Sequence, residues 1–303
     1  QIEQYCLQKI IITHLYFGQV IHLCAIQYVF LLILNKNLIY VYPAGLGDTF
    51  CATGALKKLY EKTNKRYYIA SRIPQFFCEQ PYTDCAIVTK ANDIGGINEN
   101  GINNSHEIFN KFDKIKVINW CVESHLKGKA TLVESYCDSL GVDRTKLPYF
   151  KFNKDLLHHH SLSDKPYIIY SLAQKGAENF TFGETKVFNR QQSNFIINNL
   201  KKAFPKYNFI DLSLLDISNP FDLYLTVAQS VSFVSIDTVI PHFASNEFHF
   251  KKGVVLWTHE HACSRFGYNE QVNLISNFMH PFDNVEIIVE NLKKILSATS
   301  FTF

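Results

Sequence analysis

Short apolar runs with the composition of β-strands alternate with stretches of helical periodicity along most of this chain. Strand-like runs lie at 38–42, 66–70, 85–88, 116–120, 167–172, 208–212, 232–236 and 253–257. Apolar residues at helical spacing occupy 49–62, 130–140, 191–204, 221–229, a short stretch from 241, and 285–296. Strands that alternate with helices predict parallel sheets covered by helices on both faces.

The alternation lapses once, which divides the chain. Residues 148–166 contain two prolines, a charged run and three consecutive histidines, and the strand pattern restarts at Tyr167. We therefore expect an α/β protein with two Rossmann-like domains, 37–157 and 158–303. Residues 1–36 are expected to form an ill-defined N-terminal extension. Its apolar stretch is interrupted by His14, Gln19, His22 and Gln27, so a membrane anchor is the less favoured alternative.

Charge and cysteine usage exclude several classes of protein. A formal net charge of +3 is too small to indicate a nucleic-acid partner. Eight cysteines without a C-x-x-C pair are typical of reduced thiols in a cytoplasmic protein, and they show no zinc-ligand spacing. The cluster at 158–160 fits a solvated linker better than a metal site. No metal site is therefore expected.

The first candidate site is the loop Gly45-Leu46-Gly47-Asp48, between a strand and a helix. Glycines let a backbone approach a ligand closely, and a helix N-terminus offers free N–H groups. A dinucleotide fingerprint would need a third glycine where Phe50 stands, which disfavours a nicotinamide-dependent oxidoreductase. Asp48 is either a helix cap or a carboxylate in the ligand crevice, where it could act as a general base.

The second candidate site is the turn and helix at 235–245, which follows a buried strand. Backbone N–H groups, the Thr238 hydroxyl and His242 form a set that can bind a pyrophosphate after Asp237. A capped helix with a packed histidine explains any one of these residues alone. Their combination after a strand favours a phosphate site.

Three segments in this order resemble glycosyltransferase family 9, the lipopolysaccharide heptosyltransferases. Residues 40–60 are similar to the family's opening strand, glycine loop and helix, and Lys186-Val187-Phe188 to its Lys-x-Trp step. Residues 233–245 are similar to its Asp-Thr-Gly-x-x-His-x-Ala signature. The resemblance implies a GT-B fold, in which two Rossmann-like domains face each other across a cleft. It also implies an inverting, metal-independent transfer of a heptose-like sugar from a nucleoside-diphosphate donor, ADP-heptose being the first to test.

The same resemblance assigns the residues and the partners. Asp48 is expected to be the catalytic base. The residues expected to bind the donor are Gly47, Lys186, Asp237, Thr238 and His242. The acceptor is expected to be lipopolysaccharide or another glycan, including a lipid-linked one, and no cofactor is expected. The enzyme would work in the cytoplasm, with peripheral contact at the inner face of the cytoplasmic membrane.

The chain also departs from the family's pattern. Val239 replaces the signature glycine, Phe188 replaces tryptophan and Gly54 replaces proline. These departures leave two alternatives open, a non-catalytic GT-B protein that binds sugar nucleotides and a GT-B epimerase. Basic residues on and after the first helix form either a solvated face or a surface for an anionic acceptor or membrane; they are Lys57, Lys58, Lys62, Lys65 and Arg66.

Overall fold

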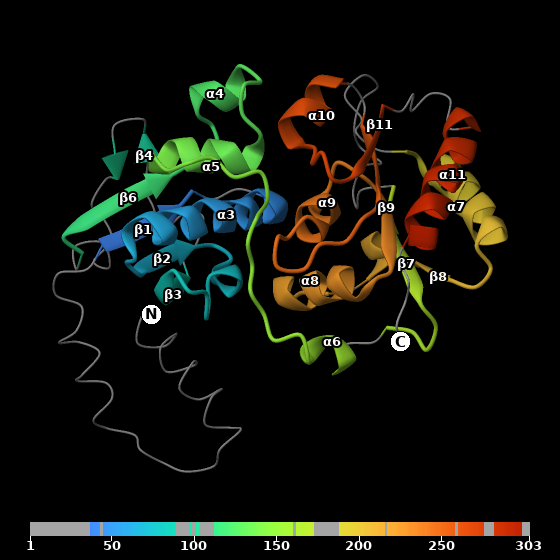
Figure 1. Ribbon diagram of the computed structural model, residues 1–303, viewed down its shortest axis with the longest axis horizontal. Coiled ribbons are helices and arrows are strands. Elements are labelled where there is room, and N and C mark those ends of the chain that lie inside the picture. Colours follow the sequence, from blue (N-terminus) through green and yellow to red (C-terminus); the bar gives the residue numbers. More distant parts are fainter. Residues whose placement is uncertain are drawn as a thin grey trace, which may run out of the picture. The chain divides into compact units, whose positions relative to one another are not determined.

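Two parallel sheets organise the protein in a computed structural model (Figure 1). The structure describes residues 37–42, 45–88, 97–98, 101–102, 112–159, 162–172, 188–215, 217–257, 260–275 and 282–298. Of these residues, those up to Gly45 and Leu59–Asn119 make up a first compact unit. Leu46–Lys58 and the residues from Trp120 onward make up a second one. The predicted extension 1–36 and Lys186 lie outside the described residues, and the predicted domain bounds at 157/158 stay a prediction.

The first sheet has four parallel strands in the order β3-β2-β1-β6. They are β1 (Asn37–Val41), β2 (Tyr67–Ser71), β3 (Thr83–Val88) and β6 (Lys114–Ile118). Side chains of Leu38, Tyr40, Tyr68 and Ile87 form a buried cluster with their neighbours. A two-stranded antiparallel pair, β4 (Ile97–Asn98) and β5 (Gly101–Ile102), lies between β3 and β6 in the sequence.

The second sheet has five parallel strands in the order β11-β10-β9-β7-β8. They are β7 (Tyr167–Ser171), β8 (Asn208–Asp211), β9 (Ser232–Ile236), β10 (Val254–Trp257) and β11 (Val272–Ile275). Because β8 and β9 lie on opposite sides of β7, the direction in which strands are added reverses there. The carboxyl ends of β7 and β9 therefore mark the topological switch point, where open α/β sheets bind ligands.

Helices cover both faces of the second sheet, as predicted (Figure 1). Helices α7 (Arg190–Ala203) and α11 (Phe282–Ala298) lie on one face, and α8 (Pro220–Gln229) and α9 (Val239–Ala244) on the other. Helix α7 begins where Asn189 and Gln192 cap each other's backbone N–H, both at 2.9 Å. The predictions missed the strand β11, the helix α10 (Glu260–Phe266) and the one-turn helices α4 (Glu123–Leu126) and α6 (Leu156–His159), which are all short.

Local capping residues also mark both ends of the helix that separates the two sets of strands in the sequence. Helix α5 (Leu132–Leu140) begins at a capping box of Thr131 and Glu134. It ends at Gly141, whose φ of 68° is the left-handed conformation that favours glycine. The predicted helix end at Gly141 is thus confirmed.

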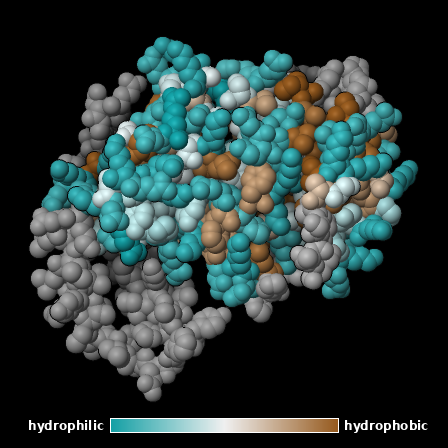
Figure 2. Space-filling model, viewed as in Figure 1, coloured by the Kyte–Doolittle hydropathy of each residue, from teal (hydrophilic) through white to brown (hydrophobic). Residues whose placement is uncertain are grey.

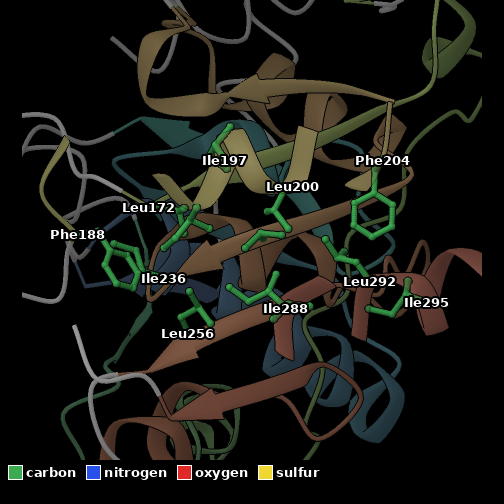
Figure 3. Close-up of a cluster of buried hydrophobic side chains, with 13 residues drawn as sticks. Leu172, Phe188, Ile197, Leu200, Phe204, Ile236, Leu256, Ile288, Leu292 and Ile295 are labelled. Atoms are coloured by element: carbon green, nitrogen blue, oxygen red, sulfur yellow. The ribbon is translucent and has the colours of Figure 1, made fainter. Parts of the chain in front are cut away.

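Branched and aromatic side chains from α7 and α11 pack against the sheet to form a core of the second unit (Figure 3). Ile197 and Leu200 come from α7, Ile288 and Leu292 from α11, and Leu256 from β10. All five are buried. Their spacing on the helices matches the apolar periodicity that predicted them.

Helix α3 (Leu46–Thr63) begins three residues before its predicted start, and its first part belongs to the second unit. An aromatic cluster holds it there. The Phe50 ring lies 4.8 Å from Phe243, 5.6 Å from Tyr224 and 5.9 Å from Phe150, measured between ring centroids. Such ring pairs add about 0.5–1.5 kcal/mol each beyond the area that they bury.

The start of the predicted linker is part of this core. The Asn246 amide donates to the Phe150 carbonyl (2.7 Å), and its oxygen accepts from the Phe150 N–H (2.8 Å). Next to this segment, a Cβ at Gly54 would lie 2.4 Å from the Leu147 carbonyl oxygen. The chain at Leu147 therefore fills the space that a side chain at position 54 would need.

Hydrophilic residues cover most of the face seen in Figure 2, with apolar residues scattered among them. Single exposed apolar side chains such as Leu214 are normal on protein surfaces. In the described ranges no helix combines the length and hydrophobicity that a bilayer crossing requires. Nor do three potential metal-binding side chains gather anywhere within those ranges.

Truncation of Leu200 tests the core of the second unit. Leu200 is 0% exposed, whereas Leu214 is 77% exposed. We expect Leu200→Ala to lower the free energy of unfolding by about 2–5 kcal/mol, because a cavity remains. The control Leu214→Ala should change it by less than about 0.5 kcal/mol. Urea unfolding measures both values, and similar losses for the two variants would contradict this packing.

The buried imidazole of His249 makes stability depend on pH. Its Nε2 lies 2.9 Å from the Ala228 carbonyl oxygen, so Nε2–H donates. Burial, and next the positive charge of Lys251, lower the pKa of His249 from 6.5 to about 4. The unfolded chain thus takes up a proton near pH 6.5 and the folded chain only near pH 4. Stability is therefore complete above pH 6.5 and falls between these values.

We expect wild type to lose about 2 kcal/mol more stability than His249→Gln between pH 7.5 and pH 4.5, with allowance for partial exposure of the ring. The glutamine amide can still donate to Ala228 but does not titrate. Urea midpoints of both proteins at both pH values give the difference. Parallel losses would show that His249 does not titrate with a lowered pKa.

Candidate functional site

The turn after β9 brings two of the predicted donor-binding residues to the switch point. Asp237 and Thr238 follow the last residue of the strand and are half-buried. Thr238 is the N-cap of α9: its Oγ1 accepts from the Ile240 N–H at 3.4 Å and shares a hydrogen bond with Ser235 Oγ at 2.8 Å. Because Thr238 caps the helix, α9 begins at Val239, two residues before the predicted start at Pro241.

Val239 fits the position at which the family's signature has glycine. It is the first residue of α9 and is half-buried. Its backbone is not among the described residues with a positive φ, so this conformation does not require glycine. The replacement is therefore compatible with the local fold, although its side chain limits how closely a ligand can approach the backbone.

Gly47 and His242, both predicted to bind the donor, touch each other. A Cβ at position 47 would lie only 2.4 Å from His242 Cδ2 and 3.2 Å from Nε2. The first turn of α3 can therefore meet α9 only with glycine at this position. This glycine was predicted to allow close approach of a ligand, whereas in the structure the close approach is made by the His242 imidazole.

His242 is 4% exposed and belongs to a buried triangle of polar side chains. Its Nδ1 lies 2.8 Å from the Tyr268 hydroxyl and 3.4 Å from Cys51 Sγ. Cys51 Sγ and the Tyr268 hydroxyl are 3.3 Å apart. Cys51 and Tyr268 were not among the site residues predicted from the sequence. One signal was available for Cys51, which follows Gly47 by four residues and therefore lies on the same side of α3.

Both hydroxyl and thiol stay protonated at neutral pH. Burial is the largest cause that raises the pKa of Cys51 and of Tyr268 well above their ordinary values. The negative charge of Asp48 acts in the same direction on both groups. Cys51 is consequently a hydrogen-bonding group here and not a thiolate nucleophile.

Asp48 is the third residue of α3, so it lies inside the first helical turn and not at the cap. A carboxylate there is stabilised by the partial positive charge of the helix N-terminus. Asp48 is half-buried, and its charge raises the pKa of Tyr136 as well as those of Cys51 and Tyr268. Asp237 also raises the pKa of Tyr268, so both carboxylates lie in the neighbourhood of its hydroxyl.

A cation and a second buried histidine complete this region. His125 Nδ1 donates to the Ala130 carbonyl at 3.0 Å, and its pKa is lowered chiefly by burial, with Arg265 adding to the effect. The Arg265 guanidinium lies over the Phe266 ring, 5.3 Å from its centroid. Arg265 lowers and Asp48 raises the pKa of His125, so the guanidinium brings positive charge into the same region. The predicted sources of positive charge were Lys186 and the helix N-terminus after Asp237.

The basic run on α3 is partly used within the protein. Lys57 Nζ lies 2.8 Å from Glu247 Oε1 and 4.6 Å from the centroid of the Tyr149 ring. Arg66 donates from Nε to the Thr83 carbonyl at 2.9 Å. These two residues therefore stabilise the units in which they lie.

No protein-family model and no curated protein matches this sequence. Solved structures of similar fold include the ADP-heptose lipopolysaccharide heptosyltransferase II of E. coli, with 12% identity, a TM-score of 0.59 and coverage of 86% of this chain and 99% of that chain. The glycosyl transferase family 9 protein of Veillonella parvula DSM 2008 has 13% identity, a TM-score of 0.53 and coverage of 86% and 90%. The iron-containing dodecameric glycosyltransferase TibC of enterotoxigenic E. coli H10407 has 10% identity, a TM-score of 0.60 and coverage of 88% and 81%. At these identities the similarity shows the fold: the chain has the two-sheet α/β fold of GT-B glycosyltransferases, as the resemblance implied.

A double-mutant cycle tests the contact between Gly47 and His242. We expect Gly47→Ala to lower the free energy of unfolding by about 1–3 kcal/mol, because the added methyl group overlaps the imidazole. In a His242→Ala background the same substitution should cost little, since the ring is gone. Chemical unfolding of the four proteins gives the coupling energy. Equal costs in both backgrounds would show that the ring and Gly47 are not in contact.

Proposed function

We propose that this protein is a glycosyltransferase that moves a heptose-like sugar from a nucleoside-diphosphate donor to a glycan acceptor. The observation that carries the proposal is the contact of Gly47 with His242. It holds the first turn of α3, and with it Asp48, against α9, the helix that follows the turn at the switch point where this fold is expected to bind a ligand. Asp48 and Asp237 both raise the pKa of Tyr268, so the proposed base and the turn proposed to bind phosphate lie in one region.

The proposed reaction is a single displacement at the anomeric carbon with inversion of configuration. Asp48 accepts the proton of the acceptor hydroxyl as that oxygen attacks, and the nucleoside diphosphate leaves from the opposite side. Negative charge grows on the diphosphate during this step. N–H groups at the start of α9, His242 and the cations Lys186 and Arg265 are the groups that would stabilise it.

ADP-heptose is the first donor to test. A TibC structure contains ADP-D-β-D-heptose, and its fold is similar to that of this chain, with 11% identity and a TM-score of 0.54. Lipopolysaccharide or another glycan, free or lipid-linked, is the proposed acceptor. A cytoplasmic location with peripheral contact at the membrane follows from that acceptor and belongs to the same proposal.

The reaction is proposed to need no metal ion. Lys186, Arg265 and the N–H groups of α9 would supply the positive charge that a divalent cation gives in other transferases. TibC is iron-containing, so the dependence of this reaction on a metal ion has to be tested. Assays in EDTA are therefore part of the functional test.

A second function is favoured because two of the residues predicted to bind the donor already make contacts within the protein. His242 is almost fully buried, and the Thr238 hydroxyl is used in capping α9. A sugar-nucleotide-binding protein without turnover needs only the fold and the phosphate site. It would bind the same donors but would not depend on Asp48.

Substitution of Asp48 separates the two functions. With ADP-heptose and glycan acceptors in EDTA, we expect wild-type turnover and an Asp48→Asn variant with kcat reduced by about 10²–10⁴-fold. Nucleotide affinity, measured by calorimetry, should stay within about twofold, because asparagine has the same size. The control Asp143→Asn lies on an exposed loop and should change neither value.

Wild-type binding without turnover for any acceptor would favour the non-catalytic function. Full turnover in Asp48→Asn would exclude Asp48 as the base. Loss of wild-type turnover in EDTA, restored by a divalent metal, would contradict metal independence.

A further inference from the structure

The loop between α9 and β10 lies at the edge of the second sheet that is opposite to the candidate site. Helix α9 begins just after the carboxyl end of β9, and β10 runs parallel to β9 from Val254. The connection 245–253 therefore returns to the amino ends of the strands. Its backbone is held in place, because the Lys251 N–H donates to the Ala244 carbonyl at 2.7 Å and the His249 N–H to the Asn246 carbonyl at 3.1 Å.

Aromatic contacts bring a second part of the chain onto this loop. The Phe152 ring lies 5.7 Å from Phe248 and 5.6 Å from His249, measured between ring centroids. The ammonium of Lys154 lies 5.2 Å from the centroid of the Phe248 ring. Three basic side chains are thereby gathered at one place, and they are Lys154, His249 and Lys251.

The positive charges at this place oppose one another. Burial, and next the charge of Lys154, lower the pKa of Lys251. After burial, the charges of Lys251 and Lys154 lower the pKa of His249 as well. No carboxylate is among the described groups that shift either pKa. Because Lys251 is half-buried, the fold holds this uncompensated charge at a cost in free energy.

The carboxylates that are nearest in the sequence do not neutralise the two lysines. Glu247 Oε1 lies 2.8 Å from Lys57 Nζ, so its charge is already paired. Asp155 is exposed and forms no ion pair with its neighbour Lys154. In the ranges that the structure describes, neither Lys154 nor Lys251 has a carboxylate within ion-pair distance.

We propose that Lys154 and Lys251 bind a phosphate group at the amino edge of the second sheet, at a site separate from the candidate donor site. A phosphate group carries a charge of about −1.5 to −2 at pH 7 and three strong acceptor oxygens. Each ammonium offers three donors, so the two lysines match one such group in charge and in hydrogen bonding. The group belongs either to a small soluble molecule or to a lipid headgroup, which share this chemistry. The inference goes beyond the proposed function and does not depend on it.

His249 can report on this site. Its Nε2–H is held by the Ala228 carbonyl, and a bound phosphate would offset the charge of the two lysines beside the ring. NMR titration of the full chain with inorganic phosphate follows the His249 signals, which the spectrum of His249→Gln identifies. We expect a saturable change of these signals at pH 7, and a pKa that rises from about 4 toward its ordinary value.

Substitution of the lysines tests the two proposed ligands. Lys154→Gln and Lys251→Gln each remove one ammonium, and we expect each to weaken phosphate binding by about fivefold or more, because a charged hydrogen bond is lost. The matched control Lys293→Gln removes one charge from an exposed position on α11 and should bind within about twofold of wild type. Affinities are taken from the His249 signals, so that phosphate bound at the turn after β9 does not enter the result.

Stability without phosphate distinguishes a binding role from a structural one. Lys251→Gln removes a half-buried charge that its neighbours repel, so we expect a thermal midpoint at least as high as that of wild type. Added phosphate should raise the midpoint of wild type more than that of the variant, because it binds the native state of wild type more tightly. A loss of stability in Lys251→Gln without phosphate would show that the ammonium serves the fold, and would overturn the inference.

Two ligands identify the source of the phosphate group. Inorganic phosphate is compared with vesicles of phosphatidylcholine that contain phosphatidic acid, and vesicles of phosphatidylcholine alone are the control. Saturable binding of free phosphate assigns a small soluble ligand, and cosedimentation with phosphatidic acid vesicles alone assigns a lipid headgroup. Either result supports the site if Lys154→Gln and Lys251→Gln weaken it.

Binding of neither ligand, or an equal loss in Lys293→Gln, overturns the inference. Turnover and ADP binding test the proposed function separately. Each can therefore fail while the other stands.

Discussion

The contact between Gly47 and His242 is the constraint on which the second unit depends. A side chain of any size at position 47 would overlap the imidazole, so the first turn of α3 and the helix α9 can meet only through this glycine. The meeting places Phe50 in the aromatic cluster and Cys51 in the polar triangle. One missing Cβ thus determines the position of a hydrophobic anchor, a hydrogen-bond network and the candidate base Asp48.

The residues of the candidate site differ in how deeply they are buried. His242, Cys51 and Tyr268 are fixed by burial and by one another, whereas the carboxylates Asp48 and Asp237 are only half-buried in the same region. Fixed dipoles beside exposed carboxylates are what electrostatic catalysis requires, because the donors need no rearrangement when charge develops. The same rigidity suits a protein that only binds.

Much of the fold could be predicted from the sequence because its signals are local. The apolar runs of β7 and β9, the cap at Asn189 and the glycine at the end of α5 act within a few residues. The partners of Gly47 and of Phe150 could not be predicted, since they lie far away in the chain and leave no periodic trace. Gly47 is an example. The sequence predicted that a group would approach the backbone closely there, but not that this group is the His242 imidazole. The short elements α10 and β11 carry too few residues for a pattern.

The second unit is assembled from pieces that are distant in the sequence. Cys51 and His242 are 191 residues apart, and the linker segment at Phe150 is held by Asn246. During synthesis at about 5–20 residues per second, the front of α3 therefore leaves the ribosome about 10–40 s before its packing partners exist. Over that interval Phe50 and its apolar neighbours are exposed to solvent or shielded by chaperones. The first turns of α3 can therefore bury Phe50 against Tyr224 and Phe243 only after most of the chain has been synthesised.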